Sequence, residues 1–537
     1  MSNRYNLFST SLRLLLFCFL PLAGFAQIPF EEGYTEGANR AQAYAITPSG
    51  NDFVVVGTIA SPNDIRDILL FEVDLNSMVT DPVRIGDVVA PAEEWGYDVK
   101  AEPQGAYVVA GASRSNNQTR PLLVQTTNTG SIQWSAAYPE GTFDGAFYAV
   151  DAVRTYGYVA AGFMGNPLNS GADNDLYLSI ISNNTGSLFC ANTFGGNGNE
   201  VAYDVIELSN GNLLAVGSTE SFGTDGKALY VVAIDSFCNK VWSRYVDGPG
   251  DDIGYAVVED NFGVTIAGQS NSYSTGNRWN TMLTRFSLNG LYLSTNIIDN
   301  PNQEDGARGI AFEGNSTDNY YILSGQTLGA DSTGWIMKIN STFGIDWFHL
   351  FSGNTIRDIS LTPAPDTQIG AGSIIPSGSS LNDAYVLHAD AMGLTGSTCN
   401  PTPLNPTISV VQPNNSTAPD TIQQAGTGAT LSLGSASVVL DEYDACTFVG
   451  LTPGLPGHVA LLPNPTDGRF RVEFILDGLR ETRVELYDLQ GRMQLTRDLG
   501  TTDHGVVPLD LSDFPAGTYL MRLRAERNVW TRKVIVR

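Results

Sequence analysis

Short apolar runs recur along the first 400 residues, separated by turns rich in glycine, asparagine and serine. Residues 200–249 show the unit. An alternating strand is followed by a turn at Asn210-Gly211, an apolar run that stops at Gly217, a third strand and a fourth strand that carries Trp242. Four short strands joined by tight turns predict one antiparallel sheet. Such a sheet cannot bury both of its faces alone, so it requires neighbours.

The unit occurs seven times, and each copy has a glycine at the end of its second strand. Successive glycines are 47 to 57 residues apart, a period typical of propeller blades. We therefore predict an all-β chain with a closed seven-bladed β-propeller. Large side chains near the start of the fourth strands are expected to fill the space between blades. The glycines are Gly57, Gly111, Gly162, Gly217, Gly268, Gly325 and Gly372, and the large side chains are Trp134, Phe189, Trp242, Leu293 and Trp347.

The N-terminus carries the pattern of a secretory signal peptide at residues 1–26. Arg4 and Arg13 are followed by an apolar run and by small residues before Gln27, the expected mature start. The run is too short for a membrane span. The segment 28–37 resembles the tail of a blade, and we expect it to pair with the seventh blade and close the ring.

Composition divides the rest of the chain. The propeller is expected at 27–400. Residues 401–450 contain many Pro, Thr, Ser, Asn and Gln and few charges, a composition typical of a flexible linker. The flanking Cys399 and Cys446 predict instead that the segment is held in place as a few irregular strands packed against the propeller. Residues 451–456 form a linker rich in proline and glycine. Residues 457–537 alternate apolar and polar positions between turns, which predicts a small Ig-like β-sandwich.

Export places the cysteines in an oxidising compartment, which favours disulfides over metal thiolates. Four cysteines remain after the signal peptide, and they allow three pairings. Cys399 and Cys446 bracket the low-charge segment, so we expect them to pair. Cys190 would then join Cys238 across the third and fourth blades, although the alternative that these two are free buried thiols stays open.

The chain has a net charge of −27, and residues before 451 carry −28 because the C-terminal segment contributes +1 (12 Lys and Arg against 11 Asp and Glu). Such acidity repels phosphate backbones, which argues against nucleic acid binding. Glu94, Glu200, Asp252 and Asp305 recur at one position of the repeat. They predict a ring of carboxylates near one mouth of the propeller, which would bind a ligand or calcium. Alternatively, each acid caps a turn and keeps that face soluble.

Motifs of catalysis are scarce. The sequence has no G-x-S-x-G, no H-E-x-x-H and no phosphate-binding loop. We therefore expect no catalytic residues, no certain metal site, and no cofactor other than calcium at the acidic positions. The remaining catalytic alternative is a secreted polysaccharide hydrolase or lyase that uses carboxylates at the propeller mouth.

The last 80 residues carry the most specific motifs of the chain, which occur in a fixed order. The motif residues are Pro463, Asn464, Pro465 and Gly468, then Tyr487, Asp488, Gly491 and Arg492, then Pro515, Gly517 and Tyr519, and finally Lys533. Together they resemble the type A C-terminal sorting domain of the type IX secretion system.

The resemblance implies signal-peptide-dependent export, passage through the outer-membrane translocon, and removal of the domain by a sortase-like peptidase near the 451–456 linker. It implies a secreted protein or one on the outer cell surface. We therefore expect a non-catalytic propeller that binds or adheres to a glycan or a protein. A purely structural coat protein is a further alternative.

Overall fold

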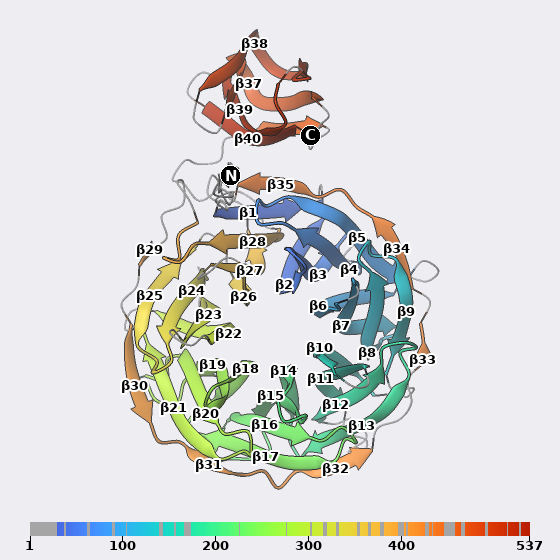
Figure 1. The fold of residues 1–537 in the computed structure, drawn as a ribbon, viewed down its shortest axis with the longest axis vertical. Helices are drawn as coiled ribbons and strands as arrows, with labels where there is room; N and C mark the ends of the chain where they lie inside the picture. The colour runs from blue at the N-terminus through green and yellow to red at the C-terminus, as the bar shows by residue number, and fades with distance from the viewer. Residues whose placement is uncertain are drawn as a thin grey trace, which may run out of the picture.

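The computed structural model places residues 30–389 in a ring of seven blades, beside a small C-terminal β-sandwich (Figure 1). This arrangement confirms the predicted fold class. Among the described residues, no helix is long and apolar enough to cross a membrane. The structure describes residues 29–536 except for 37–38, 62–64, 88–91, 104, 139–142, 155–156, 166–172, 225, 275, 301–302, 315–318, 329–331, 352–354, 364–366, 376–380, 396–401, 404–405, 425–428, 432, 445–456, 463–467, 489–491, 513 and 526–527.

Each blade has four antiparallel strands, which are ordered from the innermost strand at the axis to the outermost strand at the circumference. Blades 1 to 3 are β2 (Arg40–Ser49), β3 (Asp52–Ala60), β4 (Arg66–Val73) and β5 (Val79–Asp87); β6 (Glu93–Ala101), β7 (Ala106–Ser115), β8 (Gln118–Thr127) and β9 (Ile132–Ala137); and β10 (Gly145–Val153), β11 (Gly157–Gly165), β12 (Asn174–Ser182) and β13 (Leu188–Gly195). Blades 4 and 5 are β14 (Glu200–Glu207), β15 (Leu213–Thr219), β16 (Ala228–Ile234) and β17 (Lys240–Asp247); and β18 (Asp252–Asp260), β19 (Gly263–Ser270), β20 (Asn280–Phe286) and β21 (Tyr292–Asp299). Blades 6 and 7 are β22 (Glu304–Gly314), β23 (Asn319–Leu328), β24 (Gly334–Asn340) and β25 (Ile345–Leu350); and β26 (Thr355–Leu361), β27 (Gln368–Ile374), β28 (Asp383–Ala389) and β1 (Phe30–Thr35).

The N-terminal strand closes the ring. β1 pairs antiparallel with β28, in a register that runs from Phe30 opposite His388 to Tyr34 opposite Ala384. The prediction that the N-terminal segment completes the seventh blade is therefore confirmed. Closure removes the open edge that a linear stack of blades would leave.

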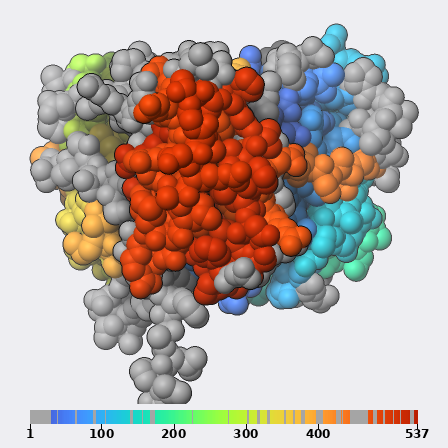
Figure 2. All heavy atoms as spheres, turned by 90° about the horizontal axis from the view of Figure 1, so that it is seen from above, coloured from blue at the N-terminus to red at the C-terminus, as the bar shows by residue number. Residues whose placement is uncertain are grey.

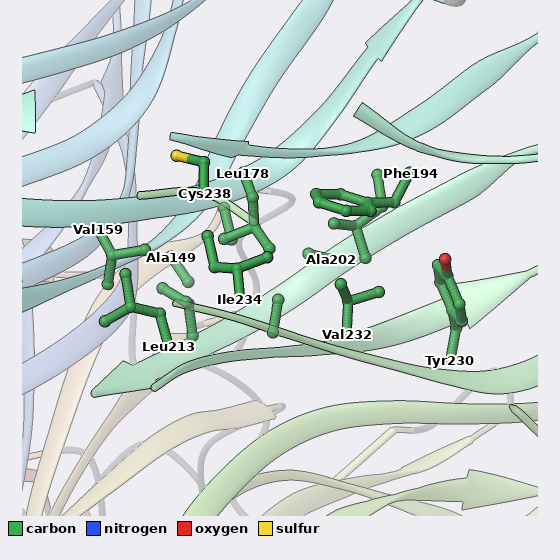
Figure 3. Packing of buried hydrophobic residues seen from close by; sticks show 14 of the residues in the cluster. Ala149, Val159, Leu178, Phe194, Ala202, Leu213, Tyr230, Val232, Ile234 and Cys238 are labelled. Carbon is green, nitrogen blue, oxygen red and sulfur yellow. The ribbon is translucent and has the colours of Figure 1, made fainter. Parts of the chain in front are cut away.

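Burial explains the sequence pattern of the strands. The second and third strands are covered on both faces by neighbouring blades, so β15 and β16 are buried along their whole length. Such strands are almost continuously apolar. Seven clusters of buried hydrophobic residues lie between neighbouring blades, and Figure 3 shows the one between blades 3 and 4.

The segment 402–444 differs from the irregular excursion that we expected. It forms seven short strands, one for each blade, which together we call the belt. Each belt strand pairs antiparallel with the outermost strand of a blade, so every blade gains a fifth strand. The belt runs through blades 6, 5, 4, 3, 2 and 1 and ends on β1 in blade 7 (Figure 1). Its strands are β29 (Thr402–Pro403), β30 (Thr407–Val411), β31 (Asn414–Thr417), β32 (Thr421–Gln424), β33 (Ala429–Thr430), β34 (Leu433–Ser437) and β35 (Asp441–Asp444).

Side chains of the belt enter the cores between blades. Ala418, Val438 and Leu431 belong to three of these cores or pack against them. Asp420, the one charged residue between 400 and 440, has a fully buried side chain that accepts hydrogen bonds from Lys240 Nζ at 2.9 Å and Ser243 Oγ at 2.7 Å. The belt is therefore part of the propeller, and in Figure 2 it passes along the circumference beside the C-terminal domain.

Three junctions between blades share one contact near the circumference. Trp134, Trp242 and Trp347 each donate an indole N–H to a backbone carbonyl in a turn of the next blade, at 2.8, 3.2 and 3.2 Å. Each indole packs on a glycine of that turn, such as Gly290 beneath Trp242. These three tryptophans fill the space between blades as predicted.

The same expectation is wrong for Phe189 and Leu293, whose side chains are exposed. They stand one residue before the position that the tryptophans occupy. An offset of one residue in a strand turns a side chain to the opposite face.

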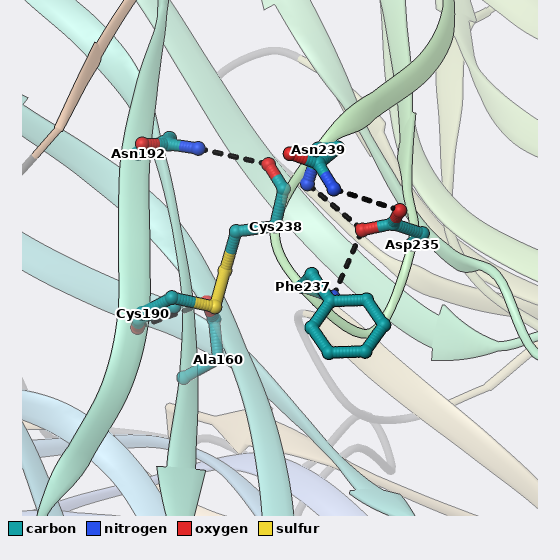
Figure 4. The surroundings of a disulfide bond; sticks show 8 residues. Ala160, Cys190, Asn192, Asp235, Phe237, Cys238 and Asn239 are labelled. Carbon is teal, nitrogen blue, oxygen red and sulfur yellow. Dashed lines mark hydrogen bonds between the residues drawn. A yellow bond between two sulfur atoms is a disulfide. The ribbon is translucent and has the colours of Figure 1, made fainter.

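A disulfide replaces the tryptophan contact between blades 3 and 4. Cys190 occupies the tryptophan position on β13, and Cys238 occupies the glycine position in the turn after β16, with a positive φ of 62°. The two residues are bonded, as predicted, and Asn192 Nδ2 donates to the Cys238 carbonyl (Figure 4). Cys399, Cys446, the signal peptide and the 451–456 linker lie outside the described residues, so the predictions for them remain predictions.

The C-terminal domain is a small β-sandwich with its own hydrophobic core. Its sheet order is β36-β37-β39-β40, and β38 also pairs with β37. The two halves of β37 pair with different parts of β38. The strands are β36 (Gly457–Leu462), β37 (Arg469–Asp488), β38 (Met493–Asp510), β39 (Gly517–Ala525) and β40 (Asn528–Val536).

Candidate functional site

The innermost strands of all seven blades have a β-bulge at the same place, where one residue lacks a partner on the second strand. The glycine that marks the repeat explains why. A Cβ atom on any of the seven glycines would lie 1.8–2.3 Å from a carbonyl oxygen of the innermost strand. Only glycine allows the backbones to approach this closely. A bulge redirects the extra side chain.

The seven bulge residues come together around the axis, and we call them the axis ring. The four successive tyrosine pairs have ring centroids 5.5, 5.0, 5.9 and 4.8 Å apart. Because each blade contributes one residue and the tyrosines of consecutive blades touch, the side chains form a circle. The axis ring consists of Tyr44, Tyr97, Tyr148, Tyr203, Tyr255, Arg308 and Arg357.

The arginines join the two ends of the tyrosine series. The Cζ atom of Arg308 lies 3.8 Å from the ring centroid of Tyr255, and that of Arg357 lies 4.8 Å from the ring centroid of Tyr44. These are cation–π distances. Arg308 and Arg357 stand on neighbouring blades. Burial, and then the charge of Arg308, lower the pKa of Arg357.

Members of the axis ring are half-buried, so water reaches them. Burial raises the pKa of Tyr203 to about 12 and also raises the pKa of Tyr97 and Tyr148. These three phenols are therefore neutral at physiological pH. The ring offers aromatic faces, hydroxyl groups and two cations to any molecule that reaches the axis.

Three aspartates directly follow ring residues and fasten one blade to the next. Each carboxylate accepts the N–H of the residue after it and the N–H of a residue on the innermost strand of the following blade. Asp98 binds Val150 at 2.7 Å, Asp204 binds Val257 at 2.7 Å, and Asp358 binds Ile46 at 2.9 Å. Both oxygens of each carboxylate are thus engaged by the backbone.

Burial disfavours the charged form of these aspartates. It raises the pKa of Asp98 to about 7 and that of Asp358 to about 6, and it places the pKa of Asp204 well above its ordinary value. Mutual repulsion adds to the effect on Asp98 and Asp204. The layer beneath the axis ring therefore takes up protons as the pH falls toward 6.

The four acids predicted from the repeat do not line an opening. Glu94, Glu200, Asp252 and Asp305 are each at most 1 % exposed. Each accepts hydrogen bonds from nearby donors, for example Thr219 Oγ1 to Glu200 at 2.6 Å and Thr281 Oγ1 to Asp305 at 2.7 Å. These contacts agree with the interpretation that each acid caps a turn. Binding of calcium or a ligand by them stays a prediction, and no cluster of three or more metal-ligating side chains occurs in the described residues.

The sequence interpretation missed the axis ring, although a signal for it was present. In blades 2, 4, 5 and 6 the ring residue stands three positions after the predicted acid, as in Glu200 and Tyr203. A tyrosine at one repeat position looks like core packing. Only the bulge, which depends on pairing with the second strand, directs it to the axis.

The sorting motifs build turns in the C-terminal domain. Arg492 donates its backbone N–H and Nε to Asp488 at 2.9 and 2.7 Å, and Tyr519 donates its hydroxyl to the Pro515 carbonyl at 2.8 Å. Gly468 has a φ of 105°, which favours glycine. Tyr487 donates its hydroxyl to Glu485, and Gly517 begins β39. Pro463, Asn464, Pro465 and Gly491 lie outside the described residues.

Lys533 connects this domain to the propeller. Its Nζ donates to the Asn76 carbonyl at 2.6 Å, contacts Ser77 Oγ, and lies 3.3 Å from Glu442 Oε1. The partners belong to the turn after β4 and to the last belt strand. The motif lysine therefore lies against blade 1 and the end of the belt.

Residues 460–537 match the family model described as secretion system C-terminal sorting domain. The chain thus carries a type IX sorting domain, which implies export to the cell surface or the medium and contact with the secretion machinery. No curated protein sequence matches the chain.

Solved structures with a similar fold share little sequence with this chain. A periplasmic gluconolactonase from Pseudomonas aeruginosa is 12% identical with a TM-score of 0.44, and the match covers 70% of this chain and 99% of that one. A glycosyl hydrolase from Bacteroides ovatus is 10% identical with a TM-score of 0.30, over 69% of this chain and 88% of that one. At these values the likenesses carry no argument about activity.

Proposed function

We propose that this chain is a non-catalytic binding protein of the cell surface or the medium, and that its axis ring holds a glycan. One observation carries the proposal. Seven side chains from seven blades stand at one position of the repeat, converge on one point and remain open to water. Concave sites lined by aromatic residues with a few polar groups are typical of ligand binding.

The chemistry of the ring suits a sugar. Tyrosine faces pack against the C–H faces of pyranose rings, while their neutral hydroxyl groups exchange hydrogen bonds with sugar hydroxyls. The tyrosines are held by their neighbours, so little conformational entropy is lost on binding. A protein partner would need a broad surface of roughly 800 Å² on this side, whereas the aromatic groups of the ring are concentrated around the axis.

The alternative of a polysaccharide hydrolase or lyase has less support. Glycosidases use two carboxyl groups that are free to reach the scissile bond. The carboxylates next to the ring, those of Asp98, Asp204 and Asp358, use both oxygens to hold backbone N–H groups of two blades. We assign them to holding the blades together.

A glycan array tests the proposal. The purified full chain and its Tyr148→Ala and Tyr203→Ala variants are applied in calcium and in chelator. We expect the wild-type chain to bind a defined set of glycans in both conditions. Each variant should lose about two- to tenfold in affinity, since a contact with one aromatic ring contributes about 0.5–1.5 kcal/mol.

Phe237→Ala is the matched control, because Phe237 is 73% exposed on an outer turn far from the axis. This variant should bind like the wild-type chain. Absence of any glycan ligand, or equal binding by the ring variants, would overturn the proposal. Loss of binding in chelator would instead indicate that the four buried acids bind calcium and that the ligand requires it.

We also propose that the sorting domain is removed after export, between Asp444 and Gly457. The last belt strand ends at Asp444 and β36 begins at Gly457, so a cut between them leaves both folded units whole. Intact-mass analysis of material from the cell surface should find a chain that ends in this interval. Recovery of chains that still end at Arg537 would refute the proposal.

A further inference from the structure

Blades 6 and 7 break the tyrosine series of the axis ring with two adjacent arginines. Neither arginine forms an ion pair in the part of the chain that the structure describes, and Arg308 Nη1 and Arg357 Nε are buried there without a hydrogen-bond partner. Buried N–H groups of a charged side chain are costly when they stay unpaired.

Nearby acids do not compensate the pair. Asp358 follows Arg357, but its oxygens accept backbone N–H groups of Ile46 and Ile359. Asp305 precedes Arg308 by three residues and binds Thr281. The chain has 56 acidic residues and 29 lysines and arginines, so acids were available, and yet two like charges stand side by side.

The tyrosine contacts of the arginines supply no hydrogen-bond acceptor. The Cζ atom of Arg308 lies over the ring of Tyr255, and that of Arg357 lies over the ring of Tyr44. A cation–π contact is made with the face of the aromatic ring, so it does not satisfy the N–H donors of a guanidinium group, which lie in the guanidinium plane. Planar donors of this kind match an acidic group with two oxygens.

We propose that Arg308 and Arg357 bind the carboxylate of an acidic sugar residue, whose pyranose ring packs on the neighbouring tyrosines. This inference deepens the proposed glycan binding and rests on it. The acidity of the propeller, −28 before residue 451, repels polyanions at long range. The ligand is therefore a glycan with an isolated uronic acid rather than a densely charged polymer.

Matched pairs of disaccharides test the inference by calorimetry on the full chain. Each pair differs only at C6 of one sugar, a carboxylate in one member and a hydroxymethyl group in the other. Glucuronate, galacturonate and mannuronate pairs are used, together with 6-sulfated versions. We expect a carboxylate member to bind at least about tenfold more tightly than its neutral partner, because hydrogen bonds between charged groups contribute about 1.5–3 kcal/mol.

Arg308→Gln and Arg357→Gln should remove this preference, so that the acidic and neutral members of a pair bind each variant with affinities within about twofold of each other. Arg154→Gln is the control, since it removes the same charge from an exposed side chain at the surface. Arg308→Lys keeps the charge but loses the planar donors, and it should recover only part of the preference. If a glutamine variant fails to fold, Arg308→Lys still tests the preference for the carboxylate.

The outcomes separate the two proposals. If neutral and acidic sugars bind equally and the tyrosine variants still weaken both, the acidic preference is overturned and glycan binding stands. If the sulfated members bind best, the arginines recognise sulfate and the carboxylate assignment is overturned. If no sugar binds the wild-type chain, both proposals fail.

Discussion

The circumference and the axis of the propeller differ in what is the same from blade to blade. At the circumference, neighbouring blades are joined by different means: a tryptophan over a glycine at Trp242 and Gly290, and a disulfide at Cys190 and Cys238. At the axis, one bulge places one side chain of each blade at the same point. Only the identity of that side chain changes, from tyrosine to arginine in blades 6 and 7.

The difference separates stability from recognition. Contacts at the circumference only have to join neighbouring blades, so chemically unrelated pairs of residues can replace one another there. At the axis the backbone repeats without change, and the choice of side chain determines what the ring can bind. Substitutions at the circumference should therefore lower the free energy of unfolding without changing binding. Substitutions at the axis should weaken binding without changing the free energy of unfolding.

Deletion of the belt, residues 402–444, should have the largest effect on stability. It exposes the edge of every blade and removes Ala418, Val438 and Asp420 from their packed positions. We expect a loss of about 5 kcal/mol or more, comparable with the whole stability of many domains, together with aggregation through the open edges. Scanning calorimetry and light scattering measure both. A soluble ring with an unchanged melting temperature would show that the four-stranded blades suffice.

Replacement of both cysteines, Cys190→Ala with Cys238→Ala, should cost about 2–4 kcal/mol. The bond closes a loop of 48 residues in the unfolded chain, and loops of this size give stabilisation of that order. Denaturant unfolding of the oxidised protein measures the loss.

A second variant of this junction sharpens the comparison. Cys190→Trp with Cys238→Gly copies the junction between blades 4 and 5, where an indole covers a glycine of equal position. It should recover part of the stability lost in the double alanine variant. No recovery would mean that the two junctions are not equivalent.

Acidification should stabilise the propeller. The pKa of Asp98 is about 7 and that of Asp358 about 6 in the folded chain, against about 3.9 in unfolded peptides. The folded state therefore binds more protons between these values, and its advantage is lost as the pH rises through 6 and 7. The melting temperature should be a few degrees higher at pH 5 than at pH 8. Asp98→Asn should reduce this difference, and a melting temperature that is flat between pH 5 and 8 would contradict the assignment.

Arg357→Gln should have the smallest effect on stability. It removes a cation–π contact, but it also removes repulsion from Arg308, and the two terms are each about 0.5–1 kcal/mol with opposite signs. The melting temperature should stay within about two degrees of the wild-type value. A large drop would place this arginine among the structural contacts and weaken the division between circumference and axis.

Most of the architecture was predictable because it is local. Apolar periodicity and the repeat glycines indicate seven four-stranded units, and the N-terminal segment resembles the missing tail of one. The sorting domain was predictable from motifs such as Tyr487-Asp488, which shape turns within a few residues of themselves. The pairing of Cys190 with Cys238 was predicted by elimination, after Cys399 had been assigned to Cys446, and free thiols were the open alternative.

The belt and the axis ring were decided by tertiary structure. The segment 402–444 has little alternation of its own, and its strands exist because each blade offers a free edge that supplies the hydrogen bonds. The acids at 94, 200, 252 and 305 recur in the sequence as conspicuously as the tyrosines, yet burial assigns them to turns. The tyrosines reach the axis because a glycine on the second strand lets one carbonyl approach, and so the innermost strand bulges. The sequence by itself therefore determined the repeat, the sorting domain that directs export, and the turns, all of which depend on neighbours in the chain. Contacts between strands far apart in the sequence decided which side chains meet.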